Sequence, residues 1–454
     1  MRAASAALGL LVLACVLSWA APGPVFADSP DGGGEVQVVQ TFGDRELTVV
    51  IRRVEPVPGP LYVDIVTHAG SPAGELALRL SRDGAQTGAT TVRLGPEPGF
   101  YRAGALAVSG AGPWEVAIDD GTRVATIPFV VPARAMAPWQ HAAYGGFAGA
   151  GLLLMVTLAV AVRLRSAAAL VPAAGTVAAL AVAVTAVVLS WSVPPLPAPG
   201  TELDPTTAGV TDPYATARLA VADNSRPPVN LVADLHGGDL RLALTDGATG
   251  HPADDLLVHD NALAHLVVVS PAGRLWHLHP VRVGPGDYRV KFTAPEAGRH
   301  AIAMEIARRG GGRQLLRTTI TLGAAAGTGD ARAVAEDVRL ERRIAPAGSP
   351  STLTARFGTP DLQPWLGMAG HMIVVGPVTG TPADAPIWAH VHAMLPSPGS
   401  PPDESVAAYG PDVPFTYTFP LPGRYLVWIQ AERGYAVRTV PATVDVPAPA
   451  GTSR

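Results

Sequence analysis

Two uncharged apolar stretches, separated by four residues, constrain the fold of this 454-residue chain more than any other feature. They span residues 142–162 and about 167–191. At about 1.5 Å per residue, a helix over the first stretch is roughly 31 Å long and covers a hydrocarbon core of about 30 Å. The pair predicts two transmembrane helices in a hairpin with a very short turn. Gly145 and Gly149 permit close helix packing, and neither stretch carries a charged residue that would indicate a transport path.

Charges beside the hairpin and at the start of the chain predict its orientation. Arg163 and Arg165 lie in the turn, which the positive-inside rule places in the cytoplasm, so both flanking regions lie outside. Residues 1–27 have the form of a secretory signal peptide, with Arg2 near the start, an apolar run and a predicted cleavage after Ala27. The predicted localisation is the cell membrane, multi-pass, with both large regions extracytoplasmic.

The cysteine count limits the metal chemistry. Cys15 is the only cysteine, and VLAC around it loosely resembles a lipoprotein box. The apolar run continues past Cys15, so cleavage after Ala27 is preferred and lipidation stays open. The mature chain then has no thiol and no disulfide, and methionine is its only soft metal ligand. The net charge of −4, without basic blocks, gives no indication of nucleic-acid binding.

The rest of the chain alternates short β-rich runs with glycine and proline turns, which is typical of antiparallel sandwiches. These runs occupy residues 35–133, 214–322 and 336–447, and residues 192–213 form a proline-rich linker. YRVKFTAPEAGRHAIAMEI and FTYTFPLPGRYLVWIQ, with a fainter YRAGALAVSGAGPWEVAI, indicate an internal repeat. The predicted fold is mainly β: three immunoglobulin-like antiparallel β-sandwich domains, with a two-helix transmembrane hairpin between the first and the second.

Two histidine-rich stretches repeat about a hundred residues apart, HLVVVSPAGRLWHLHP from residue 265 and HMIVVGPVTGTPADAPIWAHVHAMLP from residue 371. Each has a histidine, an apolar run, a turn and a His-x-His pair whose members share one strand face. A three-residue turn at residues 271–273 would place His265 opposite His279, where Cβ atoms are about 4.5–5.5 Å apart. The predicted ligands are His265, His277 and His279 in one site and His371, His390 and His392 in a second.

Three neutral imidazoles suit copper(II), zinc or nickel, and methionine would extend a site toward copper(I). Met372 and Met394 are therefore candidate auxiliary ligands of the second site, and His259 is a candidate for the first. A His/Met mixture without thiolate favours copper, with zinc as the alternative. A competing interpretation treats the His-x-His pairs as exposed strand residues and the first histidines as packing groups. The repeat at residues 35–133 lacks the histidine motif and argues against it, since the fold does not need the motif.

These motifs carry a family resemblance. AHLVVVSPAGRLWHLHP with YRVKFTAPEAGRHAI, and LQPWLGMAGHMIVV with AHVHAM, resemble the bacterial exported YtkA-like and copper-resistance-type β-sandwich modules. The resemblance covers about residues 214–447 and, faintly, 35–133, and it implies heavy-metal or copper binding. Ala264 stands where the YtkA-like motif usually has methionine. His-x-His stands where periplasmic copper chaperones have His-x-Met, which weakens the assignment of Met394.

The predicted function is a membrane-anchored extracytoplasmic metal-binding protein, with copper homeostasis or resistance as its role. The alternative is a non-enzymatic cell-envelope interaction or scaffold protein built from immunoglobulin-like modules. An enzyme is disfavoured because the sequence has no GxSxG motif, phosphate loop or paired-carboxylate constellation. The expected partners are a metal ion, the membrane and an envelope protein.

Overall fold

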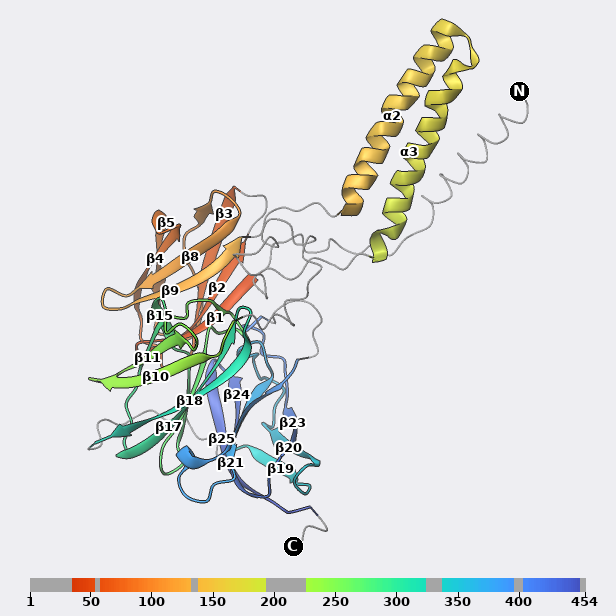
Figure 1. Cartoon of the computed structure of the whole chain (residues 1–454). Helices are drawn as coiled ribbons and strands as arrows, with labels where there is room; N and C mark the ends of the chain where they lie inside the picture. The colour runs from red at the N-terminus through yellow and green to blue at the C-terminus, as the bar shows by residue number, and fades with distance from the viewer. Residues whose placement is uncertain are drawn as a thin grey trace. The chain divides into compact units, whose positions relative to one another are not determined.

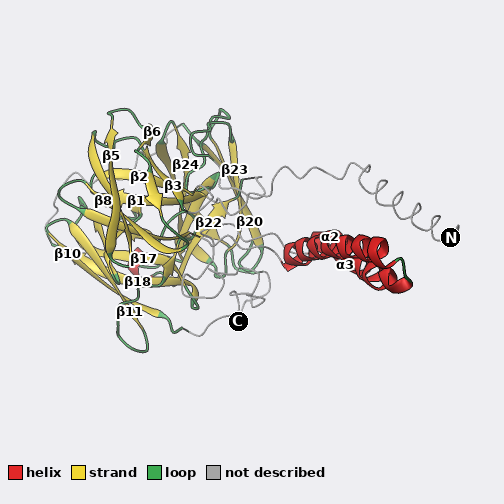
Figure 2. Cartoon of the chain, turned by 90° about the horizontal axis from the view of Figure 1, so that it is seen from above, coloured by secondary structure: helices red, strands yellow, loops and turns green. Residues whose placement is uncertain are grey.

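The computed structural model describes residues 35–53, 58–131, 138–192, 226–323, 337–395 and 403–449. The chain divides into two compact units, Met1–Asp31 and Gly32–Arg454, and every described residue belongs to the second. The predicted signal peptide at 1–27, Cys15 and nearly all of the linker at 192–213 lie outside the described residues. The described chain is mainly β, as Figure 2 shows, with antiparallel sheets and two long helices.

The first segment, residues 35–131, forms two antiparallel sheets with the strand orders β1-β2-β3-β6, to which β7 pairs through β3, and β5-β4-β8-β9. Alternating burial, as in GPWEVAID of β8, gives each sheet an apolar inner face, as expected for period-two strands. Its strands are β1 (Glu35–Phe42), β2 (Arg45–Arg53), β3 (Gly59–Thr67), β4 (Gly74–Arg82), β5 (Ala85–Leu94), β6 (Gly99–Arg102), β7 (Leu106–Val108), β8 (Gly112–Asp119) and β9 (Val124–Val131).

The second segment, residues 226–323, also forms two antiparallel sheets. Their strand orders are β10-β11-β16-β15 and β12-β17-β13-β14, and β18 pairs with β17. Its strands are β10 (Val229–His236), β11 (Asp239–Asp246), β12 (Leu256–Leu257), β13 (His265–Val269), β14 (Leu275–Leu278), β15 (Val281–Gly284), β16 (Asp287–Lys291), β17 (Gly298–Arg308) and β18 (Gly312–Leu322).

The third segment, residues 337–449, repeats the pattern with the strand orders β19-β20-β23 and β22-β21-β24-β25. A short 3-10 helix, η5 (Pro382–Asp384), lies between β21 and β22. Its strands are β19 (Arg339–Arg343), β20 (Pro350–Arg356), β21 (Gly370–Gly376), β22 (Ile387–Ala393), β23 (Asp412–Thr418), β24 (Gly423–Arg433) and β25 (Ala436–Val446).

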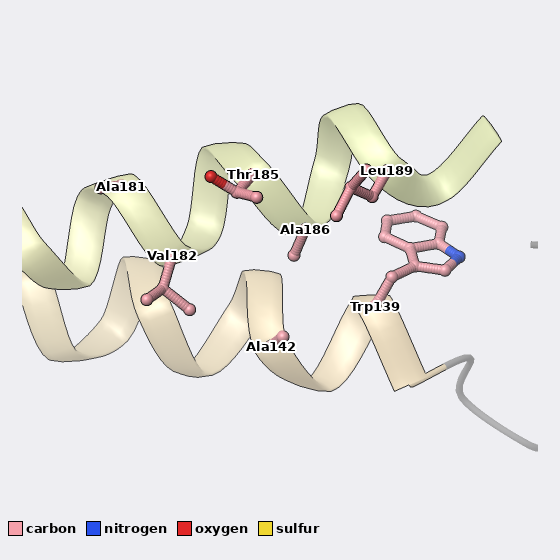
Figure 3. Close-up of a pocket in the computed structure, with 7 residues that line it drawn as sticks. All are labelled: Trp139, Ala142, Ala181, Val182, Thr185, Ala186 and Leu189. Atoms are coloured by element: carbon pink, nitrogen blue, oxygen red, sulfur yellow. The ribbon is translucent and has the colours of Figure 1, made fainter. Parts of the chain in front are cut away.

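The predicted apolar stretches form two helices, α2 (Pro138–Leu164) and α3 (Leu170–Leu189), which lie side by side in Figure 1. The 3-10 helices η1 (Ala167–Ala169) and η2 (Ser190–Ser192) flank α3. Both stretches are long and apolar enough to cross a membrane. At the end of the hairpin where α2 begins and α3 ends, Trp139 and Leu189 line an open apolar groove of about 510 Å³ (Figure 3).

The hydrophobic cores show how the segments are joined. One continuous core cluster contains inner-face residues of both the first and the second segment, such as Leu76 and Leu266. The third segment has its own core, which includes Phe415 and Tyr425. The buried cores therefore do not divide the first two segments into independent domains, and the three-domain division of the sequence is not confirmed.

A third core cluster joins the second and third segments through the sheets that carry the histidine motifs. It contains Val267 and Val269 of β13 and Ile373 and Val375 of β21. Because side chains alternate along a strand, the two valines share a face with His265, and Ile373 and Val375 share a face with His371. The two repeats therefore pack against each other through their histidine-bearing faces.

Candidate metal centre

The strand registers place each histidine triad on one face. Leu266 pairs with Leu278 and Val267 with His277, a register that brings His265 opposite His279, as the sequence predicts. In the third segment His371 pairs directly with His392. Each triad therefore lies at the end of a strand pair, on the face that meets the other segment.

The two triads form one cluster rather than two separate sites. Neighbouring imidazoles have ring centroids 4.4 to 5.9 Å apart. Contacts cross between the segments: His277 lies 5.0 Å from His390, and His265 lies 5.2 Å from His390, between ring centroids. The two predicted sites therefore lie together, because the sheets stack by the faces that carry the histidines. The histidine cluster consists of His265, His277, His279, His371, His390 and His392.

The two repeats hold the cluster in the same way. The first histidine of each repeat forms a hydrogen bond with the backbone carbonyl six residues upstream, His265 with His259 and His371 with Trp365. Both His259 and Trp365 belong to isolated β-bridges with the residue three positions further on. The contacts between segments are reciprocal: His277 reaches Gln430 of β24, whereas His390 reaches Glu305 of β17. In the strand registers Glu305 lies opposite His265, and Gln430 lies opposite His371, the first histidine of each repeat. The sequence repeat is thus also a repeat of contacts.

Most outer ring nitrogens of the cluster meet an oxygen that can only accept a hydrogen bond, so the nitrogen must donate and the tautomer is fixed. His392 Nδ1 similarly faces Asp260 Oδ2 at 3.4 Å. The other donor and acceptor pairs are His265 Nε2 with the His259 carbonyl (3.1 Å), His277 Nδ1 with Gln430 Oε1 (2.9 Å), His279 Nδ1 with Glu46 Oε1 (2.8 Å), His371 Nε2 with the Trp365 carbonyl (3.0 Å) and His390 Nδ1 with Glu305 Oε2 (3.1 Å).

The remaining nitrogens face one another as lone pairs. His390 Nε2 lies 3.0 Å from His371 Nδ1 and 3.3 Å from His392 Nε2. In a tetrahedral site with metal–nitrogen bonds of about 2.0–2.1 Å, neighbouring ligand nitrogens are about 3.3 Å apart. His265 Nδ1 and His277 Nε2 are buried without a hydrogen-bond partner. The spacing and the missing partners both fit a bound cation.

Two groups of three histidines have ligand atoms that all lie within 4.8 Å of one another. We call His265, His277 and His390 the inter-segment group, because it needs both segments. We call His371, His390 and His392 the third-segment group. His390 belongs to both groups. Since a neutral imidazole has a single nitrogen lone pair, His390 can serve one group at a time, and the two groups are alternative positions for a single ion.

Burial favours the neutral form of four of the six imidazoles. Burial, and after it the neighbouring histidines, lowers the pKa of His265, His277 and His371 well below 6.5. The pKa of His392 falls to about 4, with burial as the main cause and His390 as the next. Neutral imidazoles are the form that binds metal ions.

Carboxylates lie behind several rings of the cluster. Burial on its own raises the pKa of Glu305, but the hydrogen bond from His390 and the charges of nearby histidines outweigh it and lower the pKa. Asp260 follows the same pattern, with its hydrogen bond to His259 as the largest opposing cause. Ionised carboxylates behind imidazole ligands orient the rings and increase their basicity. The negative charge also favours a cation at the centre.

The other predicted ligands lie elsewhere. Met372 alternates with His371 along β21 and is buried in the core of the third segment, so it faces away from the cluster. Met394 follows the last strand residue of β22 and is 70% exposed. His259 supports the cluster from outside: its carbonyl accepts from His265, and its Nε2 lies 2.7 Å from Asp260 Oδ2. Met372 therefore does not extend the site, and Met394 as an auxiliary ligand stays a prediction.

Sequence reasoning missed the groups that fix the ring orientations, Glu305, Gln430, Asp260 and Glu46. For two of these groups the sequence contains an indication, a polar residue within an apolar strand sequence. Glu305 interrupts the apolar run AIAMEIA, and Gln430 ends the apolar run YLVWIQ, so each is a polar residue in a buried strand. Buried polar groups require partners. Glu46 belongs to the first segment, which lacks the histidine motif, and nothing in its sequence context indicates a role at the cluster.

One family model matches the third segment of the chain. The family described as "Domain of unknown function (DUF8832)" matches residues 332–448. No curated protein matches the chain. The resemblance to YtkA-like and copper-resistance-type modules stays a prediction.

Several solved structures resemble the chain weakly. Tandem repeats of a large adhesion protein are 12% identical and cover 91% of this chain and 75% of that one, with a TM-score of 0.16. Domains FN1 to FN3 of chicken CNTN1 are 9% identical, and the match covers 87% of this chain and 97% of that one with a TM-score of 0.15. A bacterial ice-binding adhesin is 7% identical, and the match covers 86% of this chain and 92% of that one with a TM-score of 0.16. Similarities with TM-scores this low do not support an inference about this chain.

Proposed function

We propose that this chain binds one transition-metal ion, copper or, as the alternative, zinc, in its histidine cluster. The arrangement of the ring nitrogens supports this most directly. His371 Nδ1 and His390 Nε2 lie 3.0 Å apart. Their other nitrogens donate to the Trp365 carbonyl and to Glu305, so both inner nitrogens present lone pairs. A cation between them replaces the repulsion of two lone pairs with two coordinate bonds.

The donor set favours copper(II) or zinc over copper(I). Imidazole suits both of these ions, whereas copper(I) is selected by thiolate and thioether ligands. Met372 is buried in the core of the third segment and Met394 is largely exposed, so neither is a buried thioether ligand of the cluster. Within the proposal, copper homeostasis or resistance outside the cytoplasm is the role that fits an exported protein with an imidazole site.

Metal analysis of the full chain, purified in detergent from its native membrane without added metal, tests the proposal. We expect copper or zinc at no more than one ion per chain, because both groups share His390. In a titration, the Kd should be below about 10 μM. His390→Gln should weaken binding at least about 100-fold, while the matched exchange at the exposed His236 leaves it unchanged.

Two different results would contradict two different parts of the proposal. If neither metal binds below about 10 μM, or if His390→Gln leaves the affinity unchanged, the metal-binding proposal is wrong. Two ions per chain would contradict the shared role of His390 while leaving metal binding in place.

The proposed setting is the cell membrane. The α2–α3 hairpin would anchor the chain, with Arg163 and Arg165 on the cytoplasmic side and both large regions outside. The three segments would be three immunoglobulin-like sandwiches, with the hairpin between the first and the second. Reporter fusions at the η1 turn and at the C-terminus test this orientation, since a cytoplasmic C-terminus would contradict it.

A second candidate is a non-enzymatic envelope scaffold, in which the histidines are buried polar contacts between segments. The buried ion pair between His68 of the first segment and Glu432 of the third favours it, because it shows that the segments are joined by polar contacts without a metal. A scaffold predicts metal-free protein from native membranes and co-purification of one stable envelope partner.

A further inference from the structure

A small cavity lies beside the histidine cluster, between the second and third segments. Its volume is about 20 Å³, and a water molecule needs about 10–15 Å³ measured in the same way. The polar part of the wall comes from His265, Glu305 and His390. Leu315 belongs to the wall and is 44% exposed, so the cavity reaches toward solvent. The rest of the wall consists of Val267, Ala303, Ile373, Trp388 and Ala389.

The cavity belongs to one of the two histidine groups. His265 and His390 both line it, and both are members of the inter-segment group. The third-segment group contributes only His390 to the wall. An ion in the inter-segment group would therefore lie beside open space, with three imidazoles on its other sides. Three protein ligands with one open position are typical of metal sites that exchange a ligand, whereas structural sites are closed.

Glu305 supplies a polar partner within the cavity. Its Oε2 accepts from His390 Nδ1 at 3.1 Å, and the carboxylate also lines the cavity wall. A carboxylate has about four lone-pair positions, so Glu305 can accept a further hydrogen bond from a small ligand. The apolar residues on the other side would exclude larger polar molecules.

We propose that a metal ion held by His265, His277 and His390 takes one small exchangeable ligand, a water molecule or a small monoanion, from this cavity. The inference rests on the proposed metal binding. It adds that the site is open to small molecules through a defined path past Leu315.

Azide is a suitable probe, because it is a small anion and its bond to copper(II) gives a charge-transfer absorption band. Full-length protein in detergent is loaded with copper(II) and titrated with sodium azide. We expect a saturable band in the wild-type protein. Ala303→Val adds two carbon atoms to the cavity wall without touching a histidine, and should weaken azide binding at least about tenfold while copper affinity stays within about threefold.

Ala301→Val is the matched control. Ala301 lies on the same face of β17, in the same apolar cluster, but is not part of the cavity wall. The Ala301→Val protein should bind azide with the affinity of the wild-type protein. Leu315→Trp, at the half-exposed mouth, is a second test that does not depend on the buried core tolerating a larger residue, and it should slow azide binding.

The results distinguish this inference from the function on which it rests. Copper binding without an azide band overturns the open position. So does the combination of an azide affinity that Ala303→Val leaves unchanged and an azide binding rate that Leu315→Trp leaves unchanged. Failure of copper and zinc to bind at all overturns the proposed function instead. Loss of the band in the cavity variants with copper still bound supports the inference.

Discussion

Glu305 connects the two histidine-bearing segments through a single side chain. It lies on β17 of the second segment, opposite His265, and accepts a hydrogen bond from His390 of the third. Its other oxygen lies 4.0 Å from His259 Nε2. The carboxylate thereby fixes the His390 ring so that Nε2 points into the cluster. Outer carboxylates of this kind orient metal-binding rings and make them more basic.

Glu305→Gln should therefore weaken metal binding about 10–100-fold without changing the stoichiometry. The glutamine keeps an acceptor oxygen near His390 but removes the negative charge. Affinity is measured by competition with a chelator of known strength. Glu341→Gln is the control, because Glu341 is on β19, is 42% exposed and pairs with Arg356. If Glu305→Gln binds metal as tightly as the wild type, the carboxylate does not tune the site.

At the scale of the elements, the helical hairpin depends on one close approach. A Cβ at Gly146 would lie 2.8 Å from the Ala179 carbonyl oxygen and 2.8 Å from the Ala183 Cβ. A Cβ at Gly145 would meet nothing within 4 Å, and at Gly149 the nearest atom would be 3.9 Å away. The spacing of Gly145 and Gly149 suggested a glycine contact, and the structure assigns it to the residue between them. Small residues let apolar helices approach closely.

Gly146→Val should separate α2 from α3 and destabilise the hairpin, whereas Gly145→Val should have little effect. Overpacking of this kind typically costs about 1–3 kcal/mol. The measurement is the temperature at which half of the detergent-solubilised protein leaves the monomer peak in size-exclusion chromatography. Equal behaviour of the two valine variants would show that the approach at Gly146 does not support the hairpin.

The sequence predicted the strand pairs well because their information is local. The turn at residues 271–273 and the alternation along HLVVV set the register of β13 with β14, which the structure confirms. The two apolar helices are also confirmed as elements, since a long uncharged run has few other solutions. Met372 shows the limit: its place beside His371 in sequence suggested a shared site, but alternation puts it on the opposite face.

At the scale of the whole molecule, the arrangement of the repeats decides the number of sites. Each repeat by itself indicates a triad, and nothing local in the sequence indicates that the faces of the two triads meet. Their meeting depends on the apolar contact of Val267 and Val269 with Ile373 and Val375, more than a hundred residues away. The single shared cluster therefore could not be predicted from motif spacing.

The first segment, which lacks the His-x-His motif, has a part in this arrangement. Thr41 on β1 donates its backbone N–H to the His279 carbonyl at 2.8 Å, and its hydroxyl oxygen accepts from the His279 N–H at 2.9 Å. Glu46 on β2 accepts from the His279 ring. The first segment thus covers one side of the cluster and supplies a carboxylate to a ring of the second.

The first segment also contacts the third through a buried ion pair. His68 Nδ1 donates to Glu432 Oε1 at 2.5 Å, and His68 Nε2 lies 2.9 Å from Thr48 Oγ1. Burial would lower the pKa of His68, but the charge and hydrogen bond of Glu432, with the charges of Glu404 and Glu46, outweigh it and raise the pKa to about 9. Burial raises the pKa of Glu404 to about 7 against the opposing charge of His68.

This ion pair predicts a specific pH dependence. A histidine whose pKa rises from 6.5 to about 9 on folding stabilises the fold fully below pH 6.5, and loses that contribution as pH rises through 9. His68→Gln should therefore lower the melting temperature near pH 7, on the order of 5 °C for a broken buried pair, and much less at pH 9.5. Thermal unfolding of the wild-type and His68→Gln proteins in detergent at each pH measures the difference in melting temperature, in which effects shared with the histidine cluster cancel.

His236→Gln is the control, since the exposed His236 pairs with the neighbouring Asp234, and the effect of this substitution should be small at every pH. A His68→Gln effect that stays constant from pH 7 to pH 9.5 would show that the ring acts by packing rather than by its charge.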